Sequence, residues 1–229
     1  MLLRKTVEVY DLIYDEEQVK RFAKLIDTEN GIHEVFIMAR KKYNETIENN
    51  KSGFMSPKYF YGRDAEDYLR IVRSYEKPIG SYTSKTGVPY PDDSLVLYST
   101  TNSRSGKKAA NKFMREIVDS LFGENQDSDL FNTLDKRLHS CIMSSKDKTK
   151  FVTIDIDDKS DYKEVEDYLK SIEVVPEATI ETRGGYHVLL PVSKTLNLVF
   201  EKFSKKHTMG DVSCPIPGTL QGGFKVRFV

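Results

Sequence analysis

Two aspartates, two residues apart, carry the clearest chemistry in this sequence. The stretch from residue 151 to residue 157 alternates, with three aliphatic side chains on one side of a strand and Thr153, Asp155 and Asp157 on the other. The two carboxylates would lie about 7 Å apart. Carboxylates are poor strand formers, and a hard cation such as Mg²⁺ or Mn²⁺ prefers a few oxygen ligands from protein. The alternative is a strand that ends in a polar loop at Asp157, and the strand alone favours neither interpretation.

A histidine and three basic side chains follow in the same part of the chain. Arg183 begins a tight Arg-Gly-Gly turn, and His187 lies on the strand after it. Lys225 and Arg227 share one face of a final alternating run. The spacing predicts a strand at 151–157, a helix at 162–172, strands at 178–182 and 186–190, a helix at 196–203 and a strand at 224–228.

This β-α-β-β-α-β order is typical of an RRM-like (ferredoxin-like) unit. In such a sheet the first and third strands are central neighbours, the fourth strand flanks the first, and both helices cover one face. We therefore expect Ile154, Ile156, Val188, Val226 and Phe228 to face the helices. The opposite face would be open and would carry the groups of a site for a metal and a polyphosphate, namely Asp155, Asp157, His187, Lys225 and Arg227.

The composition excludes several classes of protein. Lysine plus arginine equals aspartate plus glutamate at 35 each, so nucleic-acid binding would depend on local patches rather than on bulk charge. No apolar run reaches the length of a membrane span, and no signal-peptide core is evident. Cys141 and Cys214 are isolated, which predicts neither a zinc site nor a disulfide framework. We expect a cytoplasmic protein.

The first 145 residues are expected to form an α/β portion, followed by the RRM-like unit at 146–229. Residues 41–63 read as a polar loop ending in Tyr59, Phe60 and Tyr61, three aromatics that either stack on bases or, by preference, belong to the core. Strands are expected at 6–10, 33–39 and 95–99, and helices at 15–27, 64–75, after residue 105 and at 130–141. The helix start beside Arg104, Lys107 and Lys108 is either an anion site or a solvated helix end.

Three motifs together resemble the archaeo-eukaryotic primase superfamily, specifically the primase-polymerase-like proteins of phages, plasmids and mobile elements. They are Ile154-Asp155-Ile156-Asp157, Thr182-Arg183-Gly184-Gly185-Tyr186-His187 and Pro217-Gly218-Thr219. The resemblance implies an RRM-like catalytic unit packed on an N-terminal α/β portion. It also implies a third metal-binding carboxylate, which we assign to Asp211. The sequence shows no zinc-binding module or helicase domain, so a helicase or accessory replication protein is an expected partner.

The resemblance predicts a DNA primase or primase-polymerase core, a template-directed nucleotidyltransferase that acts on NTP or dNTP and a single-stranded DNA template. Asp155, Asp157 and Asp211 would hold two Mg²⁺ or Mn²⁺ ions. The triphosphate would be bound by Arg183, His187, Lys225 and Arg227, with Arg104, Lys107 and Lys108 as further phosphate contacts. Two alternatives remain open: a catalytically silent, RRM-like nucleic-acid-binding replication factor, and a metal-dependent nuclease.

Overall fold

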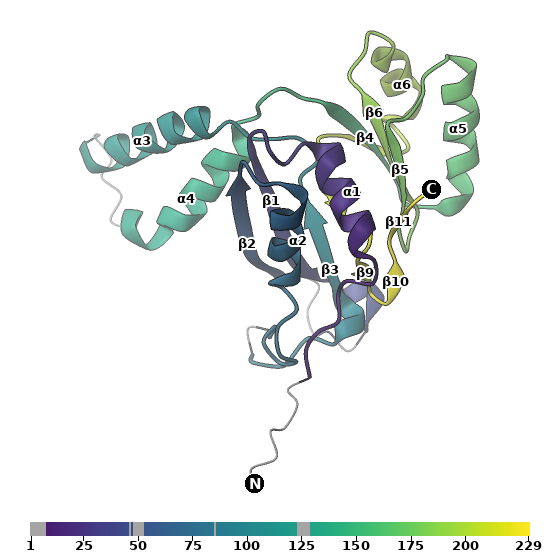
Figure 1. Ribbon diagram of the computed structural model, residues 1–229. Helices are drawn as coiled ribbons and strands as arrows, with labels where there is room; N and C mark the ends of the chain where they lie inside the picture. The colour runs from purple at the N-terminus through teal and green to yellow at the C-terminus, as the bar shows by residue number, and fades with distance from the viewer. Residues whose placement is uncertain (1–7, 46, 48–52, 85, 123–128) are drawn as a thin grey trace.

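The chain folds as a mixed α/β protein with two antiparallel sheets (Figure 1). The computed structural model describes residues 8–45, 47, 53–84, 86–122 and 129–229. The first sheet has the order β10-β9-β3-β1-β2, with β8 paired to β3, and the second has the order β11-β5-β6-β4-β7. No helix in these ranges is long and apolar enough to cross a membrane.

The first sheet is built around β1 (Ile32–Ala39), which pairs with β2 (Gly53–Tyr61) and β3 (Leu95–Ser99). The strands expected at 33–39 and 95–99 are confirmed. The loop expected at 41–63 is wrong, because its second half is β2. A register shift opposite Val35 and Ile37 interrupts this strand pair, and that irregularity hides the alternation in the sequence. Of the strand expected at 6–10, residues 6 and 7 lie outside the described residues, and Val9 makes one bridge to Pro78.

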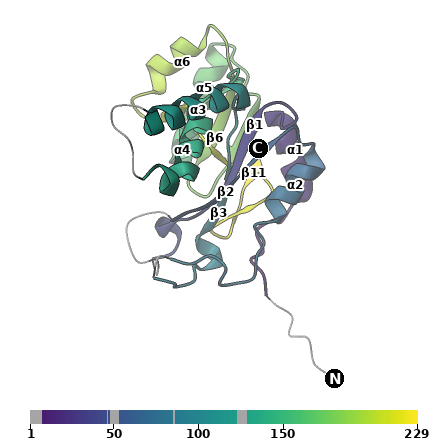
Figure 2. The same ribbon diagram turned by 90° about the vertical axis from the view of Figure 1, so that its left-hand side faces the viewer.

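The helices α1 (Glu16–Ile26) and α2 (Ala65–Arg73) lie side by side in front of the first sheet (Figure 1). Each begins after an aspartate whose side chain accepts hydrogen bonds from the first turn, Asp15 in α1 and Asp64 in α2. Their apolar stripes enter the main core. The pair α3 (Gly106–Phe122) and α4 (Leu130–Ser144) projects to one side of the molecule, which faces the viewer in Figure 2 (Figures 1 and 2). Helix α4 contacts the first sheet, because His139 Nδ1 lies 3.4 Å from Glu34 Oε1 on β1.

The second sheet places β4 (Phe151–Ile156) between β6 (Tyr186–Pro191) and β7 (Thr208–Gly210). On the far side of β6 follow β5 (Ala178–Glu181) and β11 (Arg227–Phe228). The expectation that the first and third strands are neighbours is confirmed. The expectation that 224–228 flanks 151–157 is wrong, because β7 takes that position. The expected last strand is split: β10 (Phe224–Lys225) belongs to the first sheet, and β11 pairs with β5.

Helices α5 (Tyr162–Ser171) and α6 (Leu196–Phe203) cover one face of the second sheet and enclose a core with Ile154, Ile156 and Val188, as expected. The opposite face is not open. Phe151, Ile180 and Leu189 on that face belong to the main core shared with α1, α2 and the first sheet. Val226 and Phe228 pack with this main core as well, rather than under α5 and α6. An aliphatic surface of this kind is stabilised by contact with a second apolar layer.

The chain crosses between the sheets near its end. After β7, the short strands β8 (Cys214–Pro215), β9 (Leu220–Gln221) and β10 join the first sheet, and β11 then returns to the second. A boundary at residue 146 therefore does not separate the two sheets. The crossing brings residues near 43, 155, 183 and 221 to one place.

Candidate functional site

Asp155 and His187 lie directly opposite each other on β4 and β6. The distance between His187 Nε2 and Asp155 Oδ1 is 3.3 Å. The predicted adjacency on antiparallel strands is thus confirmed, but the predicted open face is wrong at His187, which is only 6% exposed. The Asp155 side chain keeps 26% of its surface exposed, because the face of β4 changes from core to cavity between Thr153 and Asp155.

Both ring nitrogens of His187 have partners. Nε2 faces Asp155, and Nδ1 lies 3.3 Å from Cys214 Sγ. Burial lowers the pKa of His187, although the charges of Asp155 and Asp157 oppose this effect, so the imidazole is neutral near pH 7. Burial also raises the pKa of the Cys214 thiol. Cys214 is therefore a protonated partner of the histidine rather than a nucleophile.

A polar cavity of about 130 Å³ opens beside this pair. Asp155, Asp157 and His187 line it from the second sheet, and Arg40 and Lys42 from the segment that follows β1. The remaining lining residues are Tyr43, Tyr98, Ile156, Thr182, Gly184, Gly185, Val212, Ser213 and Gln221. The cavity therefore contains carboxylates on one wall and cations on the other.

The turn between β5 and β6 forms one edge of the cavity. Thr182 N donates to Gly185 O at 2.9 Å, and Gly185 N donates to the Thr182 hydroxyl at 3.1 Å. A Cβ atom at position 185 would overlap the carbonyl oxygen of Ile156. Glycine is therefore required for the turn to pack against the end of β4, next to Asp157.

Arg183 joins three distant segments at this edge. Its Nη1 donates to Gly222 O at 2.6 Å, and its guanidinium lies 4.8 Å from the centre of the Tyr43 ring. Gln221 accepts from Arg183 N at 2.7 Å and donates to the Tyr43 hydroxyl at 2.7 Å. The Arg183 side chain is exposed beside the cavity but is not one of its lining residues.

Lys225 and Arg227 lie outside the cavity lining, contrary to the expectation of one shared face. Lys225 is exposed on β10, with Nζ 5.2 Å from the centre of the Tyr14 ring. Arg227 forms an ion pair with Glu181 at 2.7 Å. A hydrogen bond from Lys159 lowers the pKa of Glu181, and Arg227 adds to this effect against burial. The split of the expected strand explains this placement, since Val226 turns into the core between the two cations.

Asp211 forms a buried ion pair with Arg104. Their side chains are 7% and 4% exposed. Asn102 Nδ2 donates to Asp211 Oδ1 at 3.0 Å, and Lys146 Nζ lies 3.6 Å from Oδ2. Burial opposes ionisation of Asp211, but the hydrogen bonds from Asn102 and Arg104 outweigh it and hold the pKa below its usual value. The structure thus places Asp211 with Arg104 and outside the cavity lining.

The three cations expected at the start of α3 have separate environments. Arg104 is buried against Asp211, so it is not available to a phosphate group. Ser105 Oγ accepts from Lys108 N at 3.3 Å and caps the helix. Lys108 Nζ donates to Lys146 O at 3.0 Å, and Lys107 is exposed.

The donor set in the cavity fits a hard divalent cation. Across the residues that the structure describes, no group of three or more His, Cys, Asp or Glu side chains is placed to hold a metal ion. Mg²⁺ needs only one or two carboxylates, because waters and substrate phosphates complete its shell. Asp155 and Asp157 on one cavity wall meet this requirement.

Sequence reasoning missed the contribution of the first sheet. Arg40 follows β1 directly, and Lys42 and Tyr43 lie in the stretch interpreted as a polar loop. Gln221 comes two residues after the Pro217-Gly218-Thr219 motif, and no role was assigned to it. The run Arg40-Lys41-Lys42-Tyr43 was the available signal, since cations interleaved with an aromatic are typical of phosphate or nucleic-acid contacts. Comparisons with models of protein families, with curated protein sequences and with solved structures found no match.

Proposed function

We propose that this protein is a metal-dependent nucleotidyltransferase of the primase-polymerase kind, which transfers a nucleoside monophosphate from NTP or dNTP to the 3′-hydroxyl of a strand paired with a single-stranded DNA template and releases pyrophosphate. The observation that carries the proposal is the cavity between the sheets. Asp155 and Asp157 face Arg40 and Lys42 across it, with His187 in register beside Asp155. Carboxylates for a cation and cations for phosphates in one small cavity suit a metal–triphosphate ligand.

Each residue has a separate role in the proposal. Asp155 and Asp157 would bind Mg²⁺ or Mn²⁺, and the bound cation would supply charge stabilisation for the triphosphate and activation of the attacking 3′-hydroxyl. Arg40 and Lys42 would contact phosphate oxygens from the opposite wall. Arg183 would add a contact at the cavity edge, where its guanidinium is exposed.

His187 would act at the boundary between cation and nucleotide. Its Nε2 lies 3.3 Å from Asp155, and Cys214 engages Nδ1. This arrangement supports a neutral imidazole whose Nε2–H donates either to Asp155 or to a phosphate oxygen. Asp211, Lys225 and Arg227 have no nucleotide role in the proposal, because they lie outside the cavity lining and two of them are ion-paired.

The proposal treats β4, α5, β5, β6, α6 and β7 as an RRM-like catalytic unit. The strand order β5-β6-β4-β7, with α5 and α6 on one face, supports this assignment. The first sheet then supplies the phosphate-binding wall. A second candidate function is a catalytically silent nucleic-acid-binding protein, favoured by the engagement of Asp211 with Arg104, which leaves two carboxylates in the cavity.

A primer-extension assay on the full chain tests the proposal. We expect incorporation with Mn²⁺ or Mg²⁺ and one or both nucleotide classes, and none after Asp155→Asn or Asp157→Asn. Glu164→Gln on α5 is a matched control that removes a carboxylate ion-paired to Lys206 outside the cavity, and it should incorporate normally. Strand cleavage without nucleotide would identify a nuclease, and binding without either reaction would identify the silent binder.

A further inference from the structure

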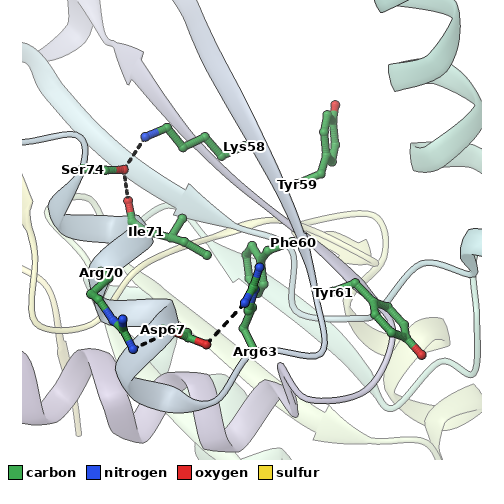
Figure 3. A pocket seen from close by; sticks show the side chains of 9 residues that line it. All are labelled: Lys58, Tyr59, Phe60, Tyr61, Arg63, Asp67, Arg70, Ile71 and Ser74. Carbon is green, nitrogen blue, oxygen red and sulfur yellow. Dashed lines mark hydrogen bonds and ion pairs between the residues drawn. The ribbon is translucent and has the colours of Figure 1, made fainter.

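A second, larger cavity opens at the other end of the first sheet, around the edge strand β2 and helix α2 (Figure 3). Its volume is about 760 Å³. Tyr61, at the end of β2, pairs with Ile32 at the start of β1, whereas Arg40 follows the end of β1. The two cavities are thus separated along β1 by up to roughly 25 Å. We call the second one the β2 groove, defined by Lys58, Tyr61, Arg63, Asp67 and Arg70.

The β2 groove carries an excess of positive charge. Among the described residues that line it, Lys58, Arg63 and Arg70 are cations and Asp67 is the carboxylate. Asp67 is shared by both arginines, at 3.6 Å from Arg63 and 2.6 Å from Arg70. The two arginine side chains keep 56% and 73% of their surface exposed. One carboxylate shared by two exposed arginines leaves donor groups free for an anionic ligand.

An exposed aromatic ring lies at the end of β2, on the other side of this strand from the three cations. Tyr61 is 67% exposed at the end of β2 (Figure 3). The two aromatics before it in the sequence are already engaged: Phe60 packs edge-on against Tyr68, and the Tyr59 hydroxyl bonds to His139. Because successive side chains of a strand point to opposite faces, the Tyr61 ring lies across β2 from Lys58 (Figure 3). A single strand held by the cations would therefore pass over the edge of β2 to stack a base on Tyr61.

The strand edge itself is poorly suited to a peptide. A second extended chain would have to pair with the outer edge of β2, but Pro57 lacks a donor there and the register shifts opposite Val35 and Ile37. Lys58 adds a charge at the same edge. Proline, lysine and irregular register are features that protect edge strands from pairing. The edge thus favours a ligand bound through side chains rather than through backbone hydrogen bonds.

We propose that the β2 groove binds single-stranded nucleic acid, with its phosphates at Lys58, Arg63 and Arg70 and one base stacked on Tyr61. The β2 segment from Lys58 to Tyr61 is about 10 Å long, which matches about three nucleotides of a stacked strand. As a path for the template, this inference rests on the proposed function. The binding itself is independent of nucleotide chemistry at Asp155.

The test measures anisotropy of a fluorescein-labelled oligothymidylate with the full chain, at several salt concentrations and without nucleotide or divalent cation. The salt slope is the slope of the logarithm of the binding constant against the logarithm of the salt concentration. We expect the double variant Arg63→Gln with Arg70→Gln to reduce its magnitude by about 1.4, since each phosphate contact on a single strand contributes about 0.7. Arg73→Gln on the same helix, ion-paired to Glu16 and outside the groove lining, is the matched control and should leave the slope unchanged.

Two further variants separate stacking from charge. Tyr61→Ala should weaken binding about 5- to 150-fold, whereas Tyr61→Phe keeps the ring and should bind normally. Asp67→Asn frees both arginines and should tighten binding. An unchanged slope after the double arginine change, or equal binding by Tyr61→Ala and wild type, overturns the proposal. If poly-glutamate displaced the oligonucleotide and Tyr61→Ala left binding unchanged, the groove would be an acidic-peptide site, and the proposal would be overturned as well.

The same assay separates this inference from the catalytic proposal. Asp155→Asn protein should bind the oligonucleotide like wild type, because Asp155 lies in the other cavity. If the protein failed to extend a primer but its oligonucleotide binding still depended on the groove residues, only the catalytic proposal would be withdrawn. If primer extension were normal and the groove variants bound the oligonucleotide like wild type, only the proposal of nucleic-acid binding in the β2 groove would be withdrawn.

Discussion

Replacing Asp211 by asparagine should destabilise the fold rather than impair catalysis directly. Asp211→Asn removes the charge that neutralises Arg104, whose side chain is 4% exposed. The guanidinium then stays buried next to a neutral amide. Lys146 is more exposed and turns to solvent without cost. The perturbation therefore isolates one buried ion pair in a shape-conserving way.

The expected magnitude follows from the burial of both partners. Breaking a buried ion pair on one side costs about 3–5 kcal/mol, because an uncompensated charge remains inside. For a chain of this size, each kcal/mol lowers the melting temperature by about 2–4 °C. Asp211→Asn should therefore melt about 6–20 °C below wild type near pH 7. Urea denaturation at a series of pH values provides the free energy of unfolding for each protein.

The pH dependence has a definite sign. Hydrogen bonds from Asn102 and Arg104 hold the folded pKa of Asp211 below its unfolded value. Its stabilisation is thus fully present above about pH 4 and is lost as the pH falls through the folded pKa. The difference in the free energy of unfolding between wild type and Asp211→Asn should therefore disappear as the pH falls through this range. Replacing both partners, as in Arg104→Met with Asp211→Leu, should recover most of the stability near pH 7.

One result would refute this reasoning. If Asp211→Asn retained wild-type stability at pH 7 but lost nucleotide incorporation, the carboxylate would have a role in the reaction. The assignment of Asp211 as a third metal ligand would then be restored, and the ion pair with Arg104 would be incidental.

Three other changes probe the cavity between the sheets. Asp155→Asn should abolish incorporation while the melting temperature of the metal-free protein stays equal or rises, because neighbouring carboxylates repel each other; thermal denaturation beside primer extension checks both parts. His187→Ala should raise the apparent KM for nucleotide about 10- to 150-fold with template binding unchanged, as measured by steady-state kinetics and anisotropy. Because burial depresses the pKa of His187, wild-type stability should fall as the pH drops below about 6.5 through the folded pKa, and His187→Gln should flatten this slope in urea titrations. Gly185→Ala should displace the turn from Ile156 and lose both incorporation and stability. Gly223→Ala adds a Cβ that meets nothing within 4 Å but at a φ of +81°, so it should lose some stability and retain incorporation.

Local sequence patterns predicted the part of the site that lies on two neighbouring strands. Alternation in 151–157 and a short glycine turn before Tyr186 fix which side chains share a face. The pairing of Asp155 with His187 follows once β4 and β6 are neighbours. The period-two pattern and the β-α-β-β-α order were therefore enough for this contact.

The pattern at the end of the chain was misleading for a physical reason. Residues 224–228 alternate, but Val226 is buried in the core between the sheets, so each half of the run joins a different sheet. The strand that flanks β4 is Thr208–Gly210, only three residues long and without an apolar alternation. Its position depends on tertiary packing beside β4 rather than on local propensity.

The two walls of the cavity between the sheets belong to different sheets, which is why the sequence did not predict the whole site. Asp155 and His187 come from the second sheet, while Arg40 and Lys42 follow a strand of the first. The face of the second sheet next to the cavity carries Ile180 and Leu189, which are fully buried in the shared core. A fragment limited to 146–229 would expose this apolar face to water, and it would also lack the cavity wall that carries Arg40 and Lys42. Packing of the two sheets and assembly of the site are thus one event, and no single motif in the sequence contains both.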